Sequence, residues 1–305
     1  MFDITGKRFW FFVISGVIIL FGIVSLATFG LKAGIEFSSG SLMTVSFEEE
    51  VDHDELRQEL ASLGYTNAIV QRTREGDFLI RLSELSDEAK TELEAGLAAR
   101  FDTLEVRGFE DVSSMVAAET ARNATIAVAV AAVGILLYVT WAFRRMPNPF
   151  HYGTCAIVAL LHDVLVVLGI FSILGGILDW EINLMFITGT LAVIGYSVNN
   201  TVVIFDRIRE NLNMGVSSNF EIVVNNSLVE TMGRSLNTSL TTLIVVLALL
   251  LFVGASIQNF AIVLLIGIIA GTYSSICIAP PLLVSWKRGA WSRFIKNLPR
   301  HSGQS

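Results

Sequence analysis

Polar and ionisable side chains interrupt the apolar segments of this sequence, where they could carry protons or ions. His162 and Asp163 stand inside "ALLHDVLVVLG", and Arg234 stands at the start of the apolar run that continues from Leu236. Hydrocarbon offers no water, so polar groups inside a membrane face protein or a wet cavity. A charge at the centre of a membrane helix costs about 2.5–3.5 kcal/mol, which favours a function for Asp163.

A second polar group lies in "GYSVNNTVVIFDRIREN", which begins at Gly195. Four of its residues share one helical face, at offsets of three, seven and ten from the first: Tyr196, Asn199, Val203 and Asp206. Asn200 lies on the flank of that face. Asp206, Arg207 and Arg209 are most simply interpreted as a charge cluster at the membrane interface.

Two further segments add polar or small residues. Thr238 belongs to a run of polar residues that follows Arg234, in "RSLNTSLTT". Gly267 and Gly271 have the small-xxx-small spacing that lets membrane helices approach closely, so we expect them to pack helices.

Structural interpretations of the same groups remain open. His162 and Asp163 could simply hold helices together, and Asn199 and Asn200 could form interhelical hydrogen bonds of about 0.6–2 kcal/mol each. Arg234 could extend to the lipid headgroups as an anchor. The residue types alone do not decide between these roles and ion passage.

The composition predicts a membrane protein. Of 305 residues, 53% are hydrophobic and only 16% are charged, and the mean hydropathy is +0.63. A membrane helix needs about 20 mostly apolar residues. Six segments qualify: Phe9–Phe29, Ala124–Phe143, Tyr152–Leu178, Ile182–Phe205, Leu236–Val253 and Phe260–Val284. No clear cleavage pattern follows the first, so we expect it to be retained.

Charge placement predicts the topology. Outside residues 30–123, all twelve Lys and Arg residues lie at the N-terminus, in the second-to-third and fourth-to-fifth connections, or in the tail. The positive-inside rule assigns those regions to the cytoplasm, with both termini. The expected organisation is a cytoplasmic N-terminus and first helix (1–29), an extracytoplasmic domain (30–123), five further membrane helices (124–285) and a basic cytoplasmic tail (286–305). Residues 206–233 are predicted to form an amphipathic segment on the inner membrane surface.

The loop at 30–123 is predicted to be a domain of its own. It is acidic, with 20 Asp and Glu residues against nine Lys and Arg residues. Alternating and helical patterns follow one another in the order βαββαβ, which is the ferredoxin-like arrangement, and no catalytic grouping appears in it. We expect Asp52 and Ser86 to begin its two helices and "REGD" to turn a hairpin.

Other chemistry is not indicated. Cys155 and Cys277 lie in apolar segments and are expected to be unreacted thiols, and the four histidines lack metal-ligand spacing. We therefore predict no metal, no cofactor, no enzymatic activity and no binding of nucleic acid. The tail mixes Trp with basic residues, which is typical of a lipid headgroup interface.

Several motifs together resemble the SecF family of bacterial Sec translocase subunits, within the resistance-nodulation-division (RND) superfamily. The matching segments run in family order: "GIEFSSGSL", "RRMPNPF", "LLHDVLVVLGIFSI", "GYSVNNTVVIFDRIREN" and "RSLNTSLTTLIVVLALLLFVG". Arg234 matches the family's functionally important arginine, Asp163 matches the acid of its HD motif, and Asp206 and Arg207 match "FDRIREN". The resemblance covers nearly the whole chain.

The resemblance implies a polytopic α-helical protein of the bacterial cytoplasmic membrane, half of a twelve-helix RND-type unit. SecD would supply the other half, and the pair would associate with the SecYEG channel. It would use the proton-motive force in late steps of export of unfolded preproteins, in contact with membrane lipids. Some relatives use sodium, and the sequence leaves the coupling ion open.

One departure from the family concerns Asn200. Many relatives have an aspartate at this position, and that acid is assigned to the proton path. Asparagine cannot take or release a proton in this range. Either the partner supplies the essential carboxylate, which we favour, or coupling differs. Half of a small-molecule or lipid exporter and a passive assembly scaffold are the alternative functions.

Overall fold

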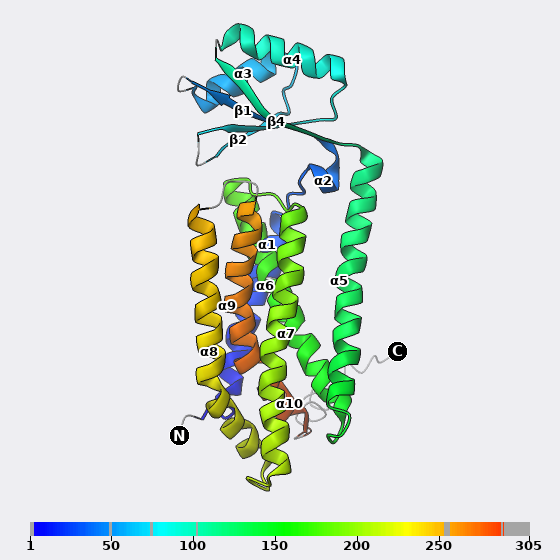
Figure 1. Cartoon of the computed structure of the whole chain (residues 1–305), viewed down its shortest axis with the longest axis vertical. Helices are drawn as coiled ribbons and strands as arrows, with labels where there is room; N and C mark the ends of the chain where they lie inside the picture. Colours follow the sequence, from blue (N-terminus) through cyan, green and yellow to red (C-terminus); the bar gives the residue numbers. More distant parts are fainter. Residues whose placement is uncertain are drawn as a thin grey trace, which may run out of the picture.

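The computed structural model describes residues 3–48, 51–73, 76–101, 103–252, 257–287 and 289. Figure 1 shows a small α/β domain above a bundle of long helices. Within the described residues, six helices are long and apolar enough to cross a membrane, as predicted. The helices of the bundle are α1 (Arg8–Thr28), α5 (Ser114–Ala142), α6 (Pro149–Leu178), α7 (Leu184–Asn213), α8 (Phe220–Phe252), α9 (Gln258–Cys277) and its continuation α10 (Ala279–Lys287).

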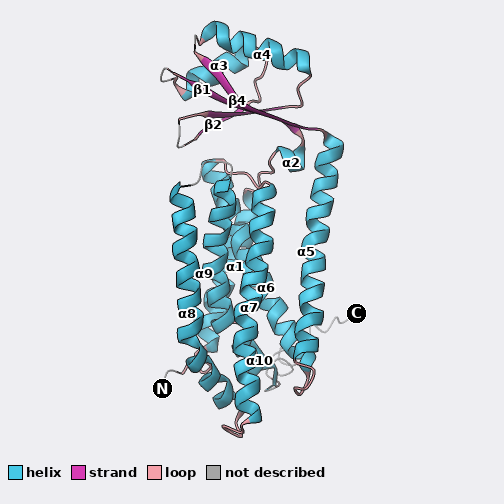
Figure 2. Ribbon diagram, viewed as in Figure 1, coloured by secondary structure: helices cyan, strands magenta, loops and turns pink. Residues whose placement is uncertain are grey.

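The α/β domain has the predicted ferredoxin-like topology. Its strands are β1 (Gly40–Phe47), β2 (Ile69–Arg72), β3 (Phe78–Leu82) and β4 (Leu104–Val112), and they form one antiparallel sheet in the order β2-β3-β1-β4. Its helices are the short α2 (Ile35–Ser38), α3 (His53–Ser62) and α4 (Asp87–Arg100). Helices α3 and α4 cover the sheet face that points away from the bundle (Figure 2).

Local sequence signals explain where the domain's helices begin. The Asp52 side chain accepts a hydrogen bond from the Asp54 amide, and the Ser86 hydroxyl accepts one from the Ala89 amide. Both caps satisfy backbone donors that the first helical turn leaves free. These two predicted helix starts are confirmed.

Two helices of the bundle differ from the predicted ones. Helix α5 begins at Ser114, ten residues before the predicted apolar span, and only Ser113 separates it from β4. Residues 206–233 do not form a separate surface helix, because α7 continues to Asn213 and α8 begins at Phe220 and runs without a break to Phe252. The apolar residues Val224 and Leu228 of this segment pack into the protein core.

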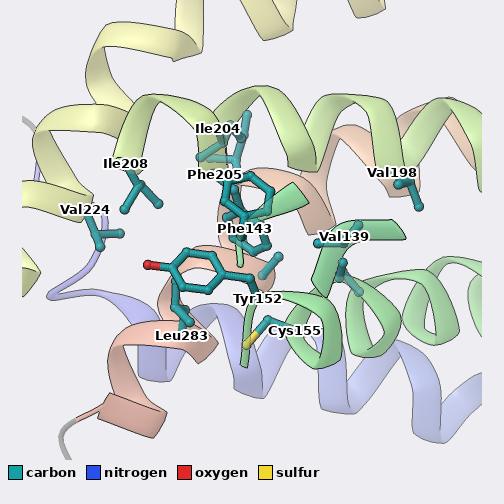
Figure 3. Close-up of a cluster of buried hydrophobic side chains, with 14 of the residues drawn as sticks. Val139, Phe143, Tyr152, Cys155, Val198, Ile204, Phe205, Ile208, Val224 and Leu283 are labelled. Carbon is teal, nitrogen blue, oxygen red and sulfur yellow. The ribbon is translucent and has the colours of Figure 1, made fainter. Parts of the chain in front are cut away.

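An aromatic cluster joins the helices at the end of the bundle remote from the α/β domain. The rings of Phe143 and Tyr152 stack with centroids 5.2 Å apart, and Phe205 meets both of them edge-on. Figure 3 shows these rings among aliphatic side chains that include Val224 and Leu283. The cluster ties α5, α6 and α7 to the start of α8 and to α10.

The connection between α6 and α7 fastens the bundle to the α/β domain. The backbone of Ile182 pairs with the segment before α2, through Gly34 N–H to Ile182 O at 2.8 Å and Ile182 N–H to Lys32 O at 2.7 Å. Arg81 of β3 donates to Glu181 at 2.6 Å. Burial is the main influence on Glu181 and raises the pKa of its carboxyl, although the bond from Arg81 acts in the opposite direction.

Candidate functional site

Asp163 lies in the middle of the bundle and joins three helices. Only 1% of the residue is exposed. One carboxylate oxygen is 3.0 Å from His162 Nδ1 on the same helix, and the other accepts hydrogen bonds from Ser197 Oγ at 2.5 Å and Ser274 Oγ at 2.8 Å. Because Ser197 belongs to α7 and Ser274 to α9, this carboxylate connects α6 with both.

Two glycines allow α7 and α9 to approach closely enough for these bonds. A Cβ atom on Gly267 would lie 2.1 Å from a Cγ atom of Val193, and one on Gly271 would lie 2.9 Å from Cβ of Ser197. Contacts this short do not occur between real side chains, so only glycine fits both positions. The structure thus places Gly267 and Gly271 directly at the α7–α9 contact.

His162 has one nitrogen in this cluster and one without a partner. An ionised carboxylate only accepts hydrogen bonds, so Nδ1 carries the hydrogen when it faces Asp163. His162 Nε2 is buried and has no hydrogen-bond partner among the described residues. The ring of Tyr273 lies 5.9 Å from the His162 ring, and the Tyr273 hydroxyl donates to Phe11 O.

More hydroxyl groups extend the polar cluster between α7 and α9. Thr201 Oγ1 and Ser275 Oγ are 2.9 Å apart, and Ser275 Oγ also donates to Ser197 O at 3.2 Å. The cluster therefore combines a carboxylate, an imidazole and four hydroxyls inside an apolar bundle. Such a set can bind a proton and pass it along hydrogen bonds.

The second group of predicted site residues lies on the outer surface of α7 and α8. A hollow of about 70 Å³ is lined by these residues: Tyr196, Asn199, Asn200, Val203, Arg234, Ser235 and Thr238. Arg234 and Asn199 are exposed, and Arg234 has no ion pair or hydrogen bond from its guanidinium within the described part of the chain. Asn200 Nδ2 is buried and has no partner there either.

Two residues of the hollow are held by the chain itself. The Tyr196 hydroxyl donates to Ser239 Oγ at 3.0 Å, which also accepts from Thr272 Oγ1 at 2.6 Å. Thr238 Oγ1 donates to the backbone oxygen of Arg234 at 2.9 Å, one turn earlier in the same helix. The hollow therefore keeps the exposed Asn199 amide and the Arg234 guanidinium available to another molecule.

The charged end of α7 forms ion pairs, as an interfacial cluster would. Arg207 Nε donates to Glu230 at 2.6 Å and its Nη1 donates to Glu210 at 2.5 Å. Arg209 pairs with Asp206 at 2.5 Å. The Arg207–Glu230 bond joins the end of α7 to α8, and all three bonds engage the arginines within the chain.

The predicted residues thus form two separate groups and one flanking cluster. No hydrogen bond or ion pair among the described residues joins Asp163 and His162 to Asn200 and Arg234. Sequence reasoning missed Ser197 as a partner of Asp163, because serine is common in membrane helices and its facing residue cannot be read from spacing. Within the described residues, no group of three or more His, Cys, Asp or Glu side chains could hold a metal ion.

Comparison with known families identifies the chain. The family model described as "Protein export membrane protein SecD/SecF, C-terminal" matches residues 92–289, and the SecD/SecF GG motif matches residues 24–51. The chain belongs to the SecD/SecF family. The family resemblance expected from the motifs is therefore confirmed.

SecF proteins and solved structures of SecDF are similar over nearly the whole chain. The protein translocase subunit SecF of Anaerolinea thermophila is 42% identical over 300 residues, which are 97% of each chain. That of Thermobaculum terrenum is 43% identical over 308 residues, again 97% of each. The crystal structure of SecDF from Thermus thermophilus matches with a TM-score of 0.84 and 34% identity, over 94% of this chain and 39% of that one.

Proposed function

We propose that this chain is the SecF-type half of a SecD–SecF unit that uses the proton-motive force to promote late steps of preprotein export. The observation that carries the proposal is the uncovered polar surface around Arg234, on a chain that spans about two fifths of the SecDF chain of Thermus thermophilus. SecDF of Bacillus subtilis is likewise 34% identical over 38% of its length. In both relatives the remainder of the chain is available to form a second half.

The exposed surface around Arg234 needs such a partner. Asn199 and Arg234 lie on helices that are long and apolar enough to cross a membrane. Uncovered amides and a guanidinium would be costly against hydrocarbon, whereas a facing helix could supply bonds to them. Gly195, one turn from Asn199, has no atom within 4 Å of the position a Cβ would take. A facing helix could approach closely at this glycine.

The partner would provide the proton site that Asn200 lacks. A carboxylate of SecD placed near Arg234 has its pKa lowered by the cation and raised by loss of water. A helix movement that changes its distance from Arg234 therefore loads or releases a proton. Passage of one charge through 100 mV supplies about 2.3 kcal/mol, which shifts a two-state equilibrium nearly fifty-fold.

Asp163 and His162 would form the second ion-handling group. Asp163 is the only buried carboxylate in the described parts of the six long helices. Protonation of Asp163 would leave its oxygens weaker acceptors for Ser197 and Ser274, and so loosen α6 from α7 and α9. We expect the α/β domain to lie outside the cytoplasmic membrane, where its movement would act on the preprotein leaving SecYEG.

Replacement of Arg234 by Leu tests the proposal. Preprotein release from energised membrane vesicles should fall to the level seen without the SecD–SecF unit, while the complex remains assembled. Arg144→Leu is the matched control, because Arg144 is exposed at the end of α5 and stacks on Trp141. Normal release by Arg234→Leu would favour the passive scaffold, and purification of the chain without any second six-helix protein would remove the proposed partner.

A further inference from the structure

A long apolar groove runs along the bundle on the side of α1. It lies between α1, α6 and α10 and has a volume of about 720 Å³, within the range of about 300–1,000 Å³ typical of ligand sites. Its walls include Phe12, Ile19, Leu165 and Leu282. Three other wall residues, Phe9, Val158 and Leu161, are exposed, so the groove is open to the surroundings of the bundle.

The groove is as long as one leaflet of a bilayer. Its lining on α1 runs from Arg8 to Ile19, eleven residues further on, which corresponds to about 16 Å of α-helix. The hydrocarbon core of a bilayer is about 30 Å thick, so a groove of this length that begins at one boundary reaches the middle. Helices α1 and α6 cross in close contact at Gly22 and Gly169. A Cβ on Gly169 would lie 2.6 Å from Cα of Gly22, so this approach requires glycine.

The mouth of the groove has the charge and the aromatic rings of a headgroup region. Arg8 lines the mouth, and its guanidinium pairs with Glu221 at 2.5 Å while remaining partly exposed. Lys7, directly before it, is exposed. His151 and Trp286 stack with ring centroids 4.6 Å apart at the adjoining ends of α6 and α10. Cations and indole rings at this level favour an anionic lipid headgroup.

Two polar residues lie part-way along the groove. Ser15 and His162 both line it and both are buried, and His162 Nε2 has no partner among the described residues. This nitrogen is inaccessible to water even with the groove empty, so it adds no polar surface to the groove wall, and the wall is almost wholly apolar at this level.

We propose that this groove binds one acyl chain of an anionic glycerophospholipid from the leaflet at the Arg8 end, with the lipid phosphate between Arg8 and Lys7. The apolar walls, which are about as long as one leaflet, favour an acyl chain. The cations at the mouth favour a negatively charged headgroup. The site does not depend on the proposed partner or on ion transport.

Gly16 allows the groove to be filled without disturbing the fold. It lines the groove, is exposed, and has no atom within 4 Å of the position a Cβ would take. Gly134 on α5 has the same two properties and lies outside the groove, so Gly134→Phe is the matched control for Gly16→Phe. Leu161→Trp is a second filling variant in case Gly16→Phe does not fold.

Lipid retention by the full chain is measured by native mass spectrometry after exchange into mixed micelles of detergent with phosphatidylglycerol or phosphatidylcholine. The wild type and Gly134→Phe should retain one more phosphatidylglycerol than Gly16→Phe and Leu161→Trp do. Lys7→Gln should weaken phosphatidylglycerol binding about fivefold and leave phosphatidylcholine unchanged, since one basic residue near an anionic lipid is worth about 1 kcal/mol.

Three results would overturn the proposal. One is equal retention of phosphatidylglycerol by the filling variants and the control, and another is equal affinity of the wild type for both lipids. The third concerns the tail: if a chain ending at Gly289 binds one lipid more than the full chain does, the tail and not a lipid occupies the groove. Unchanged binding by the shortened chain supports the lipid.

Discussion

Substitution of Gly267 by Ala measures how firmly α7 and α9 are joined. The new Cβ would lie 2.1 and 2.5 Å from the Cγ atoms of Val193 and 2.8 Å from its Cβ. Val193 is fully buried in a cluster of apolar side chains, so it cannot move away from the new Cβ without displacing its neighbours. Overpacking of this kind costs about 1–3 kcal/mol, and we expect a loss of stability in that range.

A second substitution identifies the clash. Val193→Ala removes both Cγ atoms and leaves only the 2.8 Å contact, so Gly267→Ala with Val193→Ala should regain part of the stability lost by Gly267→Ala alone. The measurement is thermal unfolding of the purified full chain in one detergent. Gly134→Ala is the control, because an added Cβ there meets nothing within 4 Å.

Two outcomes would refute this reasoning about the α7–α9 contact. If Gly267→Ala unfolds at the wild-type temperature, the two helices are not in the contact described above. If the two substitutions destabilise additively, the clash is not with Val193, since residues in contact show an interaction energy in a double-mutant cycle.

Other predictions concern the partner surface, the polar cluster and the domain contact. Gly195→Phe should prevent co-purification with SecD and leave the unfolding temperature of the isolated chain unchanged, whereas Gly134→Phe should co-purify normally. Asp163→Asn should abolish proton-driven preprotein release while the complex still assembles; if release survives, Asp163 has only a structural role. Burial raises the pKa of Glu181 in the folded chain, so the folded state holds that proton more tightly than the unfolded state does. The contribution of Glu181 to stability should therefore fall as pH rises from about 4.5 through the raised pKa. Glu181→Gln should flatten that part of the pH profile of the unfolding temperature. An unchanged profile in this variant would contradict the prediction. Arg81→Lys should keep the profile but lower the unfolding temperature slightly, because the fixed guanidinium geometry at Glu181 is lost.

The sequence predicted most of the fold because each element carries a local signal. Six apolar segments, two capping residues and alternating strands were sufficient for the membrane helices and the ferredoxin-like domain. The start of α5 was missed because Glu119 and Arg122 end the apolar run without ending the helix. Helical propensity continues through charged residues, whereas hydropathy does not.

The segment 206–233 shows a second limit of sequence reasoning. An apolar stripe at helical spacing is the same whether it faces lipid or protein, so Val224 and Leu228 gave no indication that they belong to the core. Asp163 was found because a carboxylate in an apolar run is costly. Its partner Ser197 was not, because the facing register of two helices depends on contacts such as Gly271 with Ser197.

Only Ser113 separates the edge strand β4 from α5, so a movement of the helix should move the strand with it. Helix α5 has 29 residues, which is about 43 Å of helix, and it lies at the edge of the bundle (Figure 1), where Val128, Ile135 and Val139 pack against the core. A tilt of about 5° at its far end, next to Phe143, would swing the sheet sideways by about 4 Å over that length. A small rearrangement at the Phe143 end of α5 would then move the sheet at the other end of the helix.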